Sequence, residues 1–274
     1  MTQGGYDPAI AIRIETPDDP RIAAYHAIRE RDLVGREGRF IAEGKVVLNV
    51  LFSARRFAVE SALILEQRLP GMAETLALAP AAMPVYVASQ AVMDAIAGFH
   101  IHRGVLALGR CRAEDDPEEM LAGLPADALV VALVGISNHD NMGAIFRNAA
   151  AFEADAVLID PSCCDPLYRK AIRVSVGAAL KVPFARIADE AALVDMLARH
   201  GFRQFALSPS GSRAVDTVNR DGRTALYLGT EGAGLPPALM ARMETVRIAM
   251  SQDFDSLNVA AASAVALHRL WRER

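Results

Sequence analysis

Residues 128–152 read ALVVALVGISNHDNMGAIFRNAAAF, which is an apolar run, a polar turn and then a helical pattern. This order predicts a buried strand that leads directly into a helix. Asn141 is expected to cap that helix by accepting backbone N–H bonds, and Gly143 lets another chain approach closely. Arg147 then lies one turn further along, near a helix N-terminus that favours phosphate. On this segment alone, a plain cap and a surface charge remain the stronger interpretation.

The same alternation continues to the end of the chain. Apolar runs follow at DAVLID, KVPFARI, RQFALS, ALYLGT and VRIAM, with helical patterns at 169–180, at 189–200 and from Ser256 onward. Apolar runs that alternate with helices are typical of a parallel sheet covered on both faces. The sequence therefore predicts an α/β fold, and we expect ligands beyond the carboxyl ends of its strands.

The first hundred or so residues show a second, smaller pattern. Short apolar runs at FIAEGKVVLNVLFSA, ALILEQ, MPVYVAS and RGVLALGR, separated by turn signals, predict a small α/β unit. The next stretch, CRAEDDPEEMLAGLPADA, breaks the apolar pattern with prolines and acids, so we expect a linker with one helical turn. The predicted organisation is a domain over 1–110, a linker over 111–127 and a domain over 128–274.

Composition excludes several classes of protein. With 274 residues, 52% hydrophobic and 23% charged, the chain can bury a core and is not a disordered tail. No charge-free apolar run approaches the roughly 18 residues of a membrane span, and the first residues lack the pattern of a secretion signal. The 3 Cys are too few for a disulfide framework, and His100 and His102 are the only closely spaced pair among the 6 His. We therefore expect a cytoplasmic protein without a metal or a membrane partner.

Charge excludes only one kind of partner. A net charge of -4 excludes a polycation that binds nucleic acid by bulk charge alone. Between Arg29 and Arg56, however, seven basic side chains accompany four acidic ones. This stretch is the best candidate for a basic face, although an ordinary solvated surface explains it equally well.

A glycine-rich loop follows the apolar run ALYLGT and reads LYLGTEGAGLPPALM, residues 226–240. Gly229, Gly232 and Gly234 predict a backbone that bends sharply and brings peptide groups against a ligand. The spacing G-x-x-G-x-G differs from the G-x-G-x-x-G of dinucleotide-binding sites. Glu231 in this loop either accepts hydrogen bonds from a hydroxyl or amine or is simply solvated.

The last segment is VRIAMSQDFDSLNVAAASAVALHRLW, residues 246–271. Ser256 or Asp255 is expected to cap a long helix whose first turn presents Leu257 and Asn258. The Ala-rich body of this helix is interpreted as a packing surface, in the core or against a partner subunit. Ser256 and Asn258 at its mouth are better placed for function.

Taken in order, the motifs N-x-G-x-x-x-R-N, G-T-E-G-x-G-L and S-L-N-V resemble the three signature motifs of the SpoU-type RNA 2′-O-ribose methyltransferases, TrmH-like members of the SPOUT superfamily. Each motif alone is weak, whereas the ordered triple is specific. The resemblance runs from Leu129 to the C-terminus and includes CCDPLYRKAIRVSVGA and KVPF. The N-terminal part, with FIAEGKVVLNVL and RGVLAL, is similar to the substrate-binding domain often attached to these enzymes, which is related to kink-turn-binding ribosomal proteins.

The resemblance implies a fold, an assembly and a reaction. The fold would be a C-terminal α/β SPOUT domain with a parallel sheet and a deep trefoil knot, preceded by a small α/β substrate-binding domain. The assembly would be a homodimer with active sites at the subunit interface. The reaction would transfer a methyl group from S-adenosylmethionine, bound in a bent form, to a ribose 2′-hydroxyl of ribosomal or transfer RNA.

The resemblance also implies the residues of the site through their motif positions. Arg147 would be the main catalytic residue, supported by Asn141, Glu231, Ser256 and Asn258. The cofactor would be held, largely through backbone groups, by Leu228, Gly229, Gly234, Ile248, Met250 and Leu257. RNA would contact the N-terminal domain at Arg39, Arg55 and Arg56.

Three places depart from the family pattern. The apolar run before the third motif ends Ile248-Ala249-Met250 instead of Ile-Pro-Met, and the loop that commonly carries a Gly reads SQDFD over 251–255. Glu153 takes the place of a Gly after the first motif. These changes leave the cofactor affinity open but remove no proposed catalytic group.

Two other functions stay open. A nucleotide-binding oxidoreductase would bind a dinucleotide in place of S-adenosylmethionine. A catalytically inactive, ribosome-associated RNA-binding protein would keep the fold and lose the reaction, although the intact Asn141, Arg147, Glu231 and Asn258 argue against it. Ser-His-Asp hydrolysis is disfavoured because the chain has no G-x-S-x-G turn.

Overall fold

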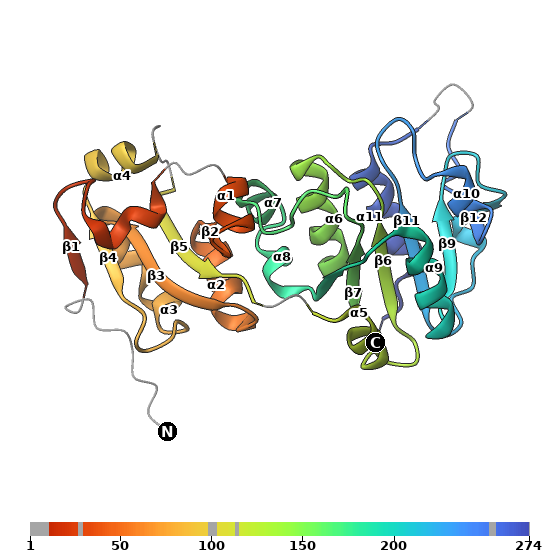
Figure 1. Ribbon diagram of the computed structural model, residues 1–274, viewed down its shortest axis with the longest axis horizontal. Coiled ribbons are helices and arrows are strands. Elements are labelled where there is room, and N and C mark those ends of the chain that lie inside the picture. The colour runs from red at the N-terminus through yellow and green to blue at the C-terminus, as the bar shows by residue number, and fades with distance from the viewer. Residues whose placement is uncertain (1–10, 27–29, 98–102, 113–114, 252–255, 274) are drawn as a thin grey trace. The chain divides into compact units, whose positions relative to one another are not determined.

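The computed structural model describes residues 11–26, 30–97, 103–112, 115–251 and 256–273. The chain divides into two compact units (Figure 1). Unit 1 is Met1–Arg112 together with Leu167–Lys181, and unit 2 is Ala113–Pro166 together with Val182–Arg274. Arg112 lies two residues beyond the predicted end of the N-terminal domain.

Unit 1 contains a mixed sheet with β1, β4 and β3 parallel to one another and β5 antiparallel to both β3 and β2. In sheet order the strands are β1 (Ile12–Ile14), β4 (Val85–Ala88), β3 (Ala58–Leu65), β5 (Val105–Arg110) and β2 (Arg39–Glu43). The helices are η2 (Pro20–Tyr25), α1 (Glu30–Gly35), α2 (Lys45–Ala54), η3 (Glu66–Met72), α3 (Ala73–Leu76), α4 (Gln90–Ala97), α7 (Arg169–Val174) and α8 (Ala178–Lys181). This arrangement is the small α/β unit that the apolar runs predict.

Helix α2 begins immediately after β2. Gly44 makes the turn between them with a φ of 101°, a value that residues with a side chain rarely adopt. Val47, Leu48, Leu51 and Phe52 are buried on one stripe of the helix, as expected for an amphipathic helix on a sheet. The start of α2 is thereby fixed at the carboxyl end of β2.

The helical pattern predicted over 169–180 is interrupted in the structure. Two short helices, α7 and α8, are separated at Val176 and Gly177, whose φ angles are 54° and 86°. A Cβ on Gly177 would lie 3.0 Å from Val50 Cβ of α2, and the positive φ adds strain for any residue with a side chain, so glycine is favoured at this turn. This segment groups with unit 1, which the continuous domain predicted over 128–274 does not anticipate.

Unit 2 contains a seven-stranded sheet in which every neighbouring pair is parallel. In sheet order the strands are β10 (Arg213–Ala214), β12 (Glu244–Arg247), β9 (Arg203–Leu207), β11 (Thr224–Leu228), β6 (Leu129–Leu133), β7 (Ala156–Ile159) and β8 (Phe184–Arg186). The predicted parallel α/β sheet is confirmed. The short β10 was not predicted, and β12 ends before Ile248, so the apolar residues that follow it lie in a loop.

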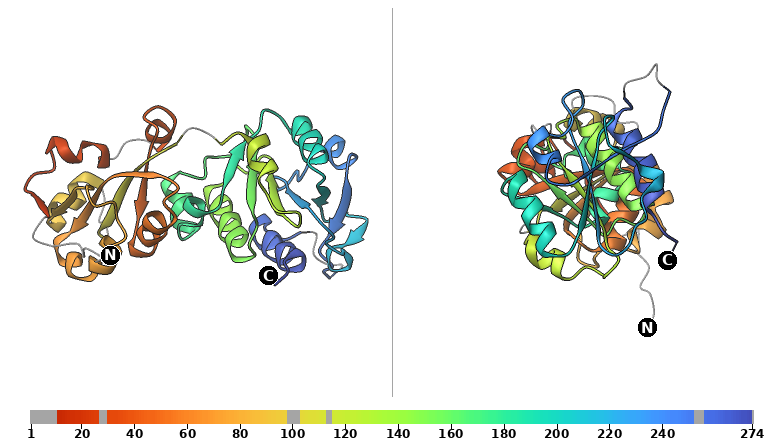
Figure 2. Two further views of the ribbon diagram at one scale, coloured as in Figure 1. Left: turned by 90° about the horizontal axis from the view of Figure 1, so that it is seen from below. Right: turned by 90° about the vertical axis from the view of Figure 1, so that its right-hand side faces the viewer.

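Helices cover both faces of this sheet (Figure 2). They are α5 (Pro117–Ala122), α6 (His139–Ala151), α9 (Glu190–Arg199), η4 (Val215–Thr217), α10 (Pro237–Met240) and α11 (Val259–Leu270). Val130 and Ala132 of β6 share a buried cluster with Leu193 of α9 and Leu121 of α5, and the alternate residues of β6 point to the opposite face. Leu121 is fully buried there, and the segment predicted as a linker over 111–127 belongs to unit 2 from Ala113 onward.

Helices α6 and α11 pack against each other although more than a hundred residues separate them. Asn148 Nδ2 donates to Ala260 O and to Ser263 Oγ, both at 2.8 Å. Ser263 is completely buried. The helix of the first motif and the C-terminal helix therefore form one packed pair.

Both helices begin at residues other than those predicted. Asn138, in place of Asn141, caps α6, because its Oδ1 accepts from the backbone N–H of Asp140 at 2.8 Å and of Asn141 at 3.4 Å. Asn258, in place of Ser256, caps α11, and Asp255 lies outside the described residues. Asn141 lies three residues after Asn138, and Ser256 lies two residues before Asn258. All four residues are of types that cap helices well, so propensity alone does not separate them.

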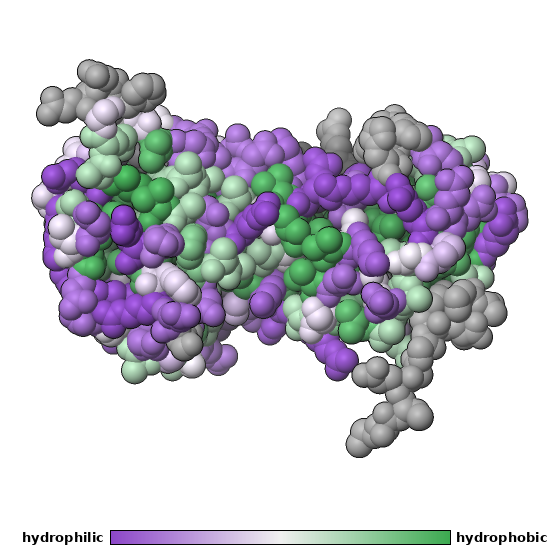
Figure 3. All heavy atoms as spheres, turned by 180° about the vertical axis from the view of Figure 1, so that it is seen from behind, coloured by the Kyte–Doolittle hydropathy of each residue, from purple (hydrophilic) through white to green (hydrophobic). Residues whose placement is uncertain are grey.

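No helix in the described part of the chain has both the length and the apolar character needed to cross a bilayer. On the face drawn in Figure 3, hydrophobic side chains gather in several patches among polar ones.

Candidate active site

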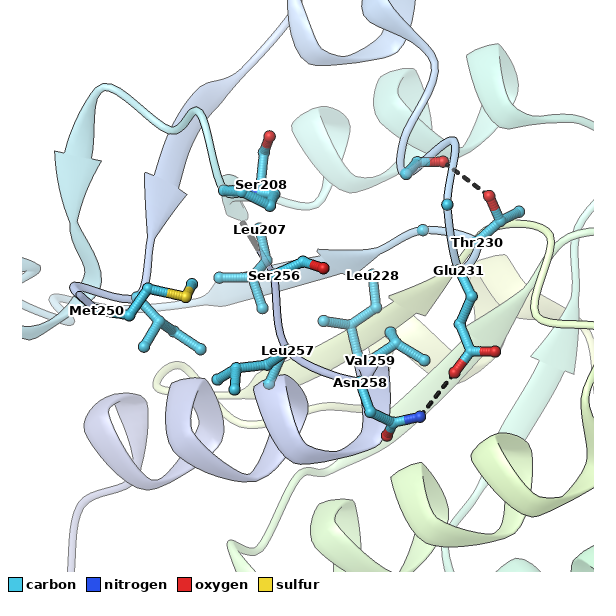
Figure 4. A pocket seen from close by; sticks show the side chains of 16 residues that line it. Leu207, Ser208, Leu228, Thr230, Glu231, Met250, Ser256, Leu257, Asn258 and Val259 are labelled. Atoms are coloured by element: carbon cyan, nitrogen blue, oxygen red, sulfur yellow. Dashed lines mark hydrogen bonds between the residues drawn. The ribbon is translucent and has the colours of Figure 1, made fainter. Parts of the chain in front are cut away.

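A cavity of about 320 Å³ lies in unit 2, beyond the carboxyl ends of β9 and β11 and beside the start of α11 (Figure 4). It is lined by all of the residues predicted to hold the cofactor, namely Leu228, Gly229, Gly234, Ile248, Met250 and Leu257. Three of the predicted catalytic residues also line it, namely Glu231, Ser256 and Asn258. We call this cavity the motif pocket.

One side of the motif pocket is apolar. Met250 and Leu257 point into it beside Leu228 (Figure 4), and they remain 36% and 44% exposed. Large apolar side chains that stay accessible inside a cavity favour a ligand with an apolar part. Both lie between the end of β12 and the start of α11, although the sequence predicted Met250 in an apolar run and Leu257 in the first turn of a helix.

The glycine loop after β11 is folded tightly on itself. Thr230 and Gly234 form an antiparallel bridge, in which Gly234 N–H donates to Thr230 O at 3.1 Å. A Cβ on Gly229 would lie 2.4 Å from Gly234 C and from Leu235 N. Because those contacts are to backbone atoms that cannot swing aside, only glycine fits at position 229.

The other side of the motif pocket is polar, and Asn258 is its centre. Asn258 Nδ2 donates to Asn141 Oδ1 at 3.0 Å and to Glu231 Oε1 at 2.6 Å. The second contact is drawn in Figure 4. Asn258 Oδ1 meanwhile accepts from the backbone N–H groups of Ala260 and Ala261 at 2.9 and 3.3 Å. One side chain from each of the three motifs therefore meets in a single network.

Glu231 has spare hydrogen-bonding capacity in this network. Its Oε1 is taken by Asn258, whereas Oε2 accepts no hydrogen bond from any described residue. The side chain is exposed. Its free oxygen can accept a hydrogen bond from a hydroxyl that enters the cavity.

Arg147 is not brought to the motif pocket of its own chain. It is exposed on α6, is not among the lining residues, and forms no hydrogen bond or ion pair with the part of the chain that is described. It lies six residues after Asn141, which places it about 9 Å further along the helix and on a different face. The predicted main catalytic residue is thus available at the surface but separate from the other candidates.

The predicted RNA-contacting arginines belong to unit 1 and differ from one another. Arg39 is held by Glu37 at 3.3 Å and Glu60 at 3.1 Å. Arg56 lies over the ring of Phe57, 5.0 Å from its centroid. Arg55 is exposed at the end of α2 with a φ of 51°. Arg29, which begins the basic stretch between Arg29 and Arg56, lies outside the described residues.

Sequence reasoning missed one wall of the motif pocket. Leu207, Ser208 and Pro209, at the end of β9, line it. The run RQFALS was predicted as a strand, and the rule that ligands lie beyond carboxyl strand ends would have pointed to SPS. The missing information was that β9 lies next to β11 in the sheet.

Comparison with known proteins places the chain among RNA methylases. Residues 128–268 match the SpoU rRNA Methylase family. An uncharacterized tRNA/rRNA methyltransferase of Mycobacterium bovis is 40% identical over 266 residues, which cover 93% of this chain and 90% of that protein. A Mycobacterium tuberculosis protein of the same description is 41% identical over 268 residues, with the same coverage.

Solved structures agree along nearly the whole chain. An RNA 2′-O ribose methyltransferase is 26% identical, with a TM-score of 0.73 over 94% of this chain and 98% of that one. The SpoU methyltransferase AviRb from Streptomyces viridochromogenes, solved with the cofactor AdoMet, shares the fold at 22% identity, with a TM-score of 0.78 over 92% of this chain and 97% of that one. With residues of two of its motifs lining one cavity and its sequence matched over this length, the chain belongs to the SpoU rRNA methylase family.

Proposed function

We propose that the protein transfers a methyl group from S-adenosylmethionine to a ribose 2′-hydroxyl of ribosomal or transfer RNA. The observation that carries this proposal is the motif pocket, at which the residues of the glycine loop and of the third motif meet around Asn258. Membership of an RNA methylase family and a structural relative described as an RNA 2′-O ribose methyltransferase support it.

The motif pocket fits S-adenosylmethionine in size and chemistry. Its volume of about 320 Å³ lies at the lower end of the range for small-molecule sites, about 300–1,000 Å³. Leu228, Ile248, Met250 and Leu257 would contact apolar parts of the molecule, and the tight turn at Gly229 would bring backbone groups against it. Glu231, the one acidic residue among the described residues that line the cavity, favours a positively charged ligand. When bound, the cofactor supplies a methyl group attached to a cationic sulfur.

The residues of the chain would aim the ribose hydroxyl and stabilise its charge. Positioning is the larger task, since displacement at a sulfonium releases a neutral leaving group. Glu231 Oε2 is placed to accept a hydrogen bond from the hydroxyl, with Asn258 holding the carboxylate in place. The proton would leave to the RNA phosphate, to water or to a neighbouring side chain.

Arg147 would bind the phosphate next to the target ribose and stabilise the developing alkoxide. A guanidinium has a pKa above about 12 and is a poor general base, which favours this role over proton removal. Because Arg147 is exposed away from the motif pocket of its own chain, we propose that it acts at the pocket of a second subunit in a homodimer. The deep trefoil knot belongs to the same proposal and would fix the glycine loop and the third motif against each other.

RNA recognition is proposed to involve unit 1. Arg55 and Arg56 remain candidates there, whereas the two carboxylates that hold Arg39 reduce what it can offer to a phosphate.

The test is methyl incorporation by purified protein with the variant Arg147→Lys. Lysine keeps the charge but loses the planar fork that binds phosphate in a bidentate manner. We expect kcat/KM to fall by roughly tenfold or more, with the Kd for S-adenosylmethionine unchanged because Arg147 does not line the motif pocket. Undiminished turnover would contradict the role of Arg147. RNA binding without methyl transfer would instead favour the noncatalytic alternative, and dinucleotide binding would favour an oxidoreductase.

A further inference from the structure

We propose that a second cavity, in unit 1, binds successive phosphates of the substrate RNA backbone; this inference rests on the proposed function. The cavity measures about 620 Å³ and is lined by the cationic side chains of Lys45, Arg68, Arg103 and Arg173. Much of its lining lies in segments that carry the family resemblance, at 44–47, 103–105 and 173–176, but the residues predicted from the sequence to contact RNA do not line it. We call it the cationic cavity.

All the described charged side chains that line the cationic cavity are positive. In the part of the chain that the structure describes, the lining contains four cations and no acidic side chain. Glu43, the buried acid beside it, is already bound by Arg169 at 3.0 Å and lies 3.7 Å from Arg173. Four like charges in one cavity repel one another, so an anion bound among them would stabilise the arrangement.

The start of α2 adds to the same positive field. Gly44 provides no side-chain cap for this helix, and its first turn contains no acidic residue. The first helical residue is instead Lys45, a cation at the end of the helix that favours negative charge. A cation at this position departs from the usual charge preference of a helix N-terminus, and such departures are found most often at functional positions.

Packing holds the cations around the cavity. Lys45 Nζ donates to Gly71 O at 2.8 Å, which ties the start of α2 to the end of η3. A Cβ on Gly44 would lie 3.2 Å from Arg103 Nη1, so the guanidinium of Arg103 rests against the turn before α2. The cations thus come from four separate segments of the chain, and only the fold brings them together.

The chemistry of the lining favours a phosphate backbone over bases. Among the described residues, no aromatic side chain lines the cationic cavity, so this part of the lining offers no ring on which a base could stack. Guanidinium groups bind phosphate oxygens well. Each phosphodiester carries one negative charge, and four cations therefore match several neighbouring phosphates. A free polyphosphate has the same chemistry and must be distinguished by experiment.

The experiment measures binding of unmodified, in vitro transcribed ribosomal RNA to the full-length protein at several KCl concentrations. The test variant is R68S/R103S, the charge-preserving variant is R68K/R103K, and the matched control is R13S/R21S, which removes two exposed arginines of unit 1 that pair with acids elsewhere. We expect R68S/R103S to bind RNA roughly tenfold more weakly and to reduce the slope of log K against log salt by about 1.4–1.8. R68K/R103K should keep most of the affinity, and the control should resemble the wild type. Equal melting curves by circular dichroism exclude a folding defect.

Kinetics separate this inference from the proposed function. R68S/R103S should raise the KM for RNA roughly tenfold while kcat at saturating RNA stays within about twofold. Wild-type affinity and salt slope in R68S/R103S would overturn the inference even if the enzyme is active. Tight binding of inorganic pyrophosphate that R68S/R103S abolishes, with RNA affinity unchanged, would also overturn it and would identify a site for a small anion. If the wild type methylates no RNA, the proposed function fails, while the binding data still decide whether the cationic cavity holds RNA.

Discussion

Asn258 uses the two ends of one amide for two tasks. Its oxygen caps α11, and its nitrogen joins Asn141 to Glu231. The first task concerns the stability of the helix, and the second concerns the arrangement of the motif pocket. A substitution that keeps one task and removes the other can therefore separate them.

Asn258→Ser is expected to retain the cap and lose the link. Serine caps helices about as well as asparagine, so the melting temperature should change little. Without the amide N–H, Glu231 loses its partner, and since a hydrogen bond to a charged group contributes about 1.5–3 kcal/mol, kcat/KM should fall roughly tenfold to a hundredfold. Asn258→Ala is the comparison: it should lose the same activity and also about 1 kcal/mol of stability. Wild-type methyl transfer by Asn258→Ser would show that the network has no catalytic importance.

Gly229→Ala is expected to disturb the motif pocket directly. The new Cβ would meet Gly234 C and Leu235 N at 2.4 Å, and overpacking of this kind costs about 1–3 kcal/mol. The Kd for S-adenosylmethionine, measured by isothermal titration calorimetry, should rise because the glycine loop must move.

The matched control for this loop is Gly123→Ala at the end of α5. There the nearest atoms are 3.7 Å away and φ is -77°, so stability should stay the same or rise slightly. Unchanged cofactor binding in Gly229→Ala would contradict the close packing seen in the loop.

At the scale of elements, the sequence predicted which segments are strands and helices better than where they begin and end. The helix predicted at 189–200 is present with Asp189 as its cap, because periodicity and cap coincide there. In the first motif, Asn138 and Asn141 are both good caps, and the tertiary bond from Asn258 to Asn141 is invisible in the sequence. The break between α7 and α8 at Val176 and Gly177 lies close to Val50 of α2. The hydrophobic pattern of 169–180 alone cannot show this contact.

The pairing of α6 with α11 depends on Asn148. Because Nδ2 of Asn148 donates to Ser263 Oγ as well as to Ala260 O, Asn148→Ala and Ser263→Ala should not have additive effects on stability. A double-mutant cycle with urea unfolding should give a coupling energy of about 0.5–1.5 kcal/mol. Additive effects within error would mean that apolar contacts, and not this bond, join the two helices.

At the scale of the whole molecule, the sequence predicted the part of the candidate site that one chain forms by itself. The carboxyl ends of parallel strands and three separated motifs predicted one pocket, and the residues of two motifs line it. Arg147 does not line this pocket, and its proposed action at the pocket of a second subunit lies beyond what the structure of one chain shows. Of the cations of the cationic cavity, only Lys45 lies in the basic stretch that the sequence indicated, and the other three come from three further segments.

Mixed dimers test whether Arg147 acts in the neighbouring subunit. Arg147→Ala removes the guanidinium, and Leu257→Arg places a cation in the motif pocket at a side chain exposed enough to be replaced without unfolding. Each homodimer should be inactive. Co-expressed with two different tags and purified as a mixed dimer, the pair should regain about half of wild-type activity, because one intact pocket then meets one intact Arg147. No recovery in the mixed dimer would place Arg147 at the pocket of its own chain.

The nature of the methylated atom tests the central claim most directly. RNA labelled by the wild-type protein with methyl-tritiated S-adenosylmethionine is hydrolysed in alkali, which cannot cleave after a 2′-O-methylated ribose because that hydroxyl no longer attacks the phosphate. We predict that the label appears in alkali-resistant dinucleotides and falls roughly tenfold to a hundredfold when Asn258→Ala replaces the wild type. Label in mononucleotides would show methylation of a base, and would contradict the assignment of the motif pocket to ribose 2′-hydroxyl methylation.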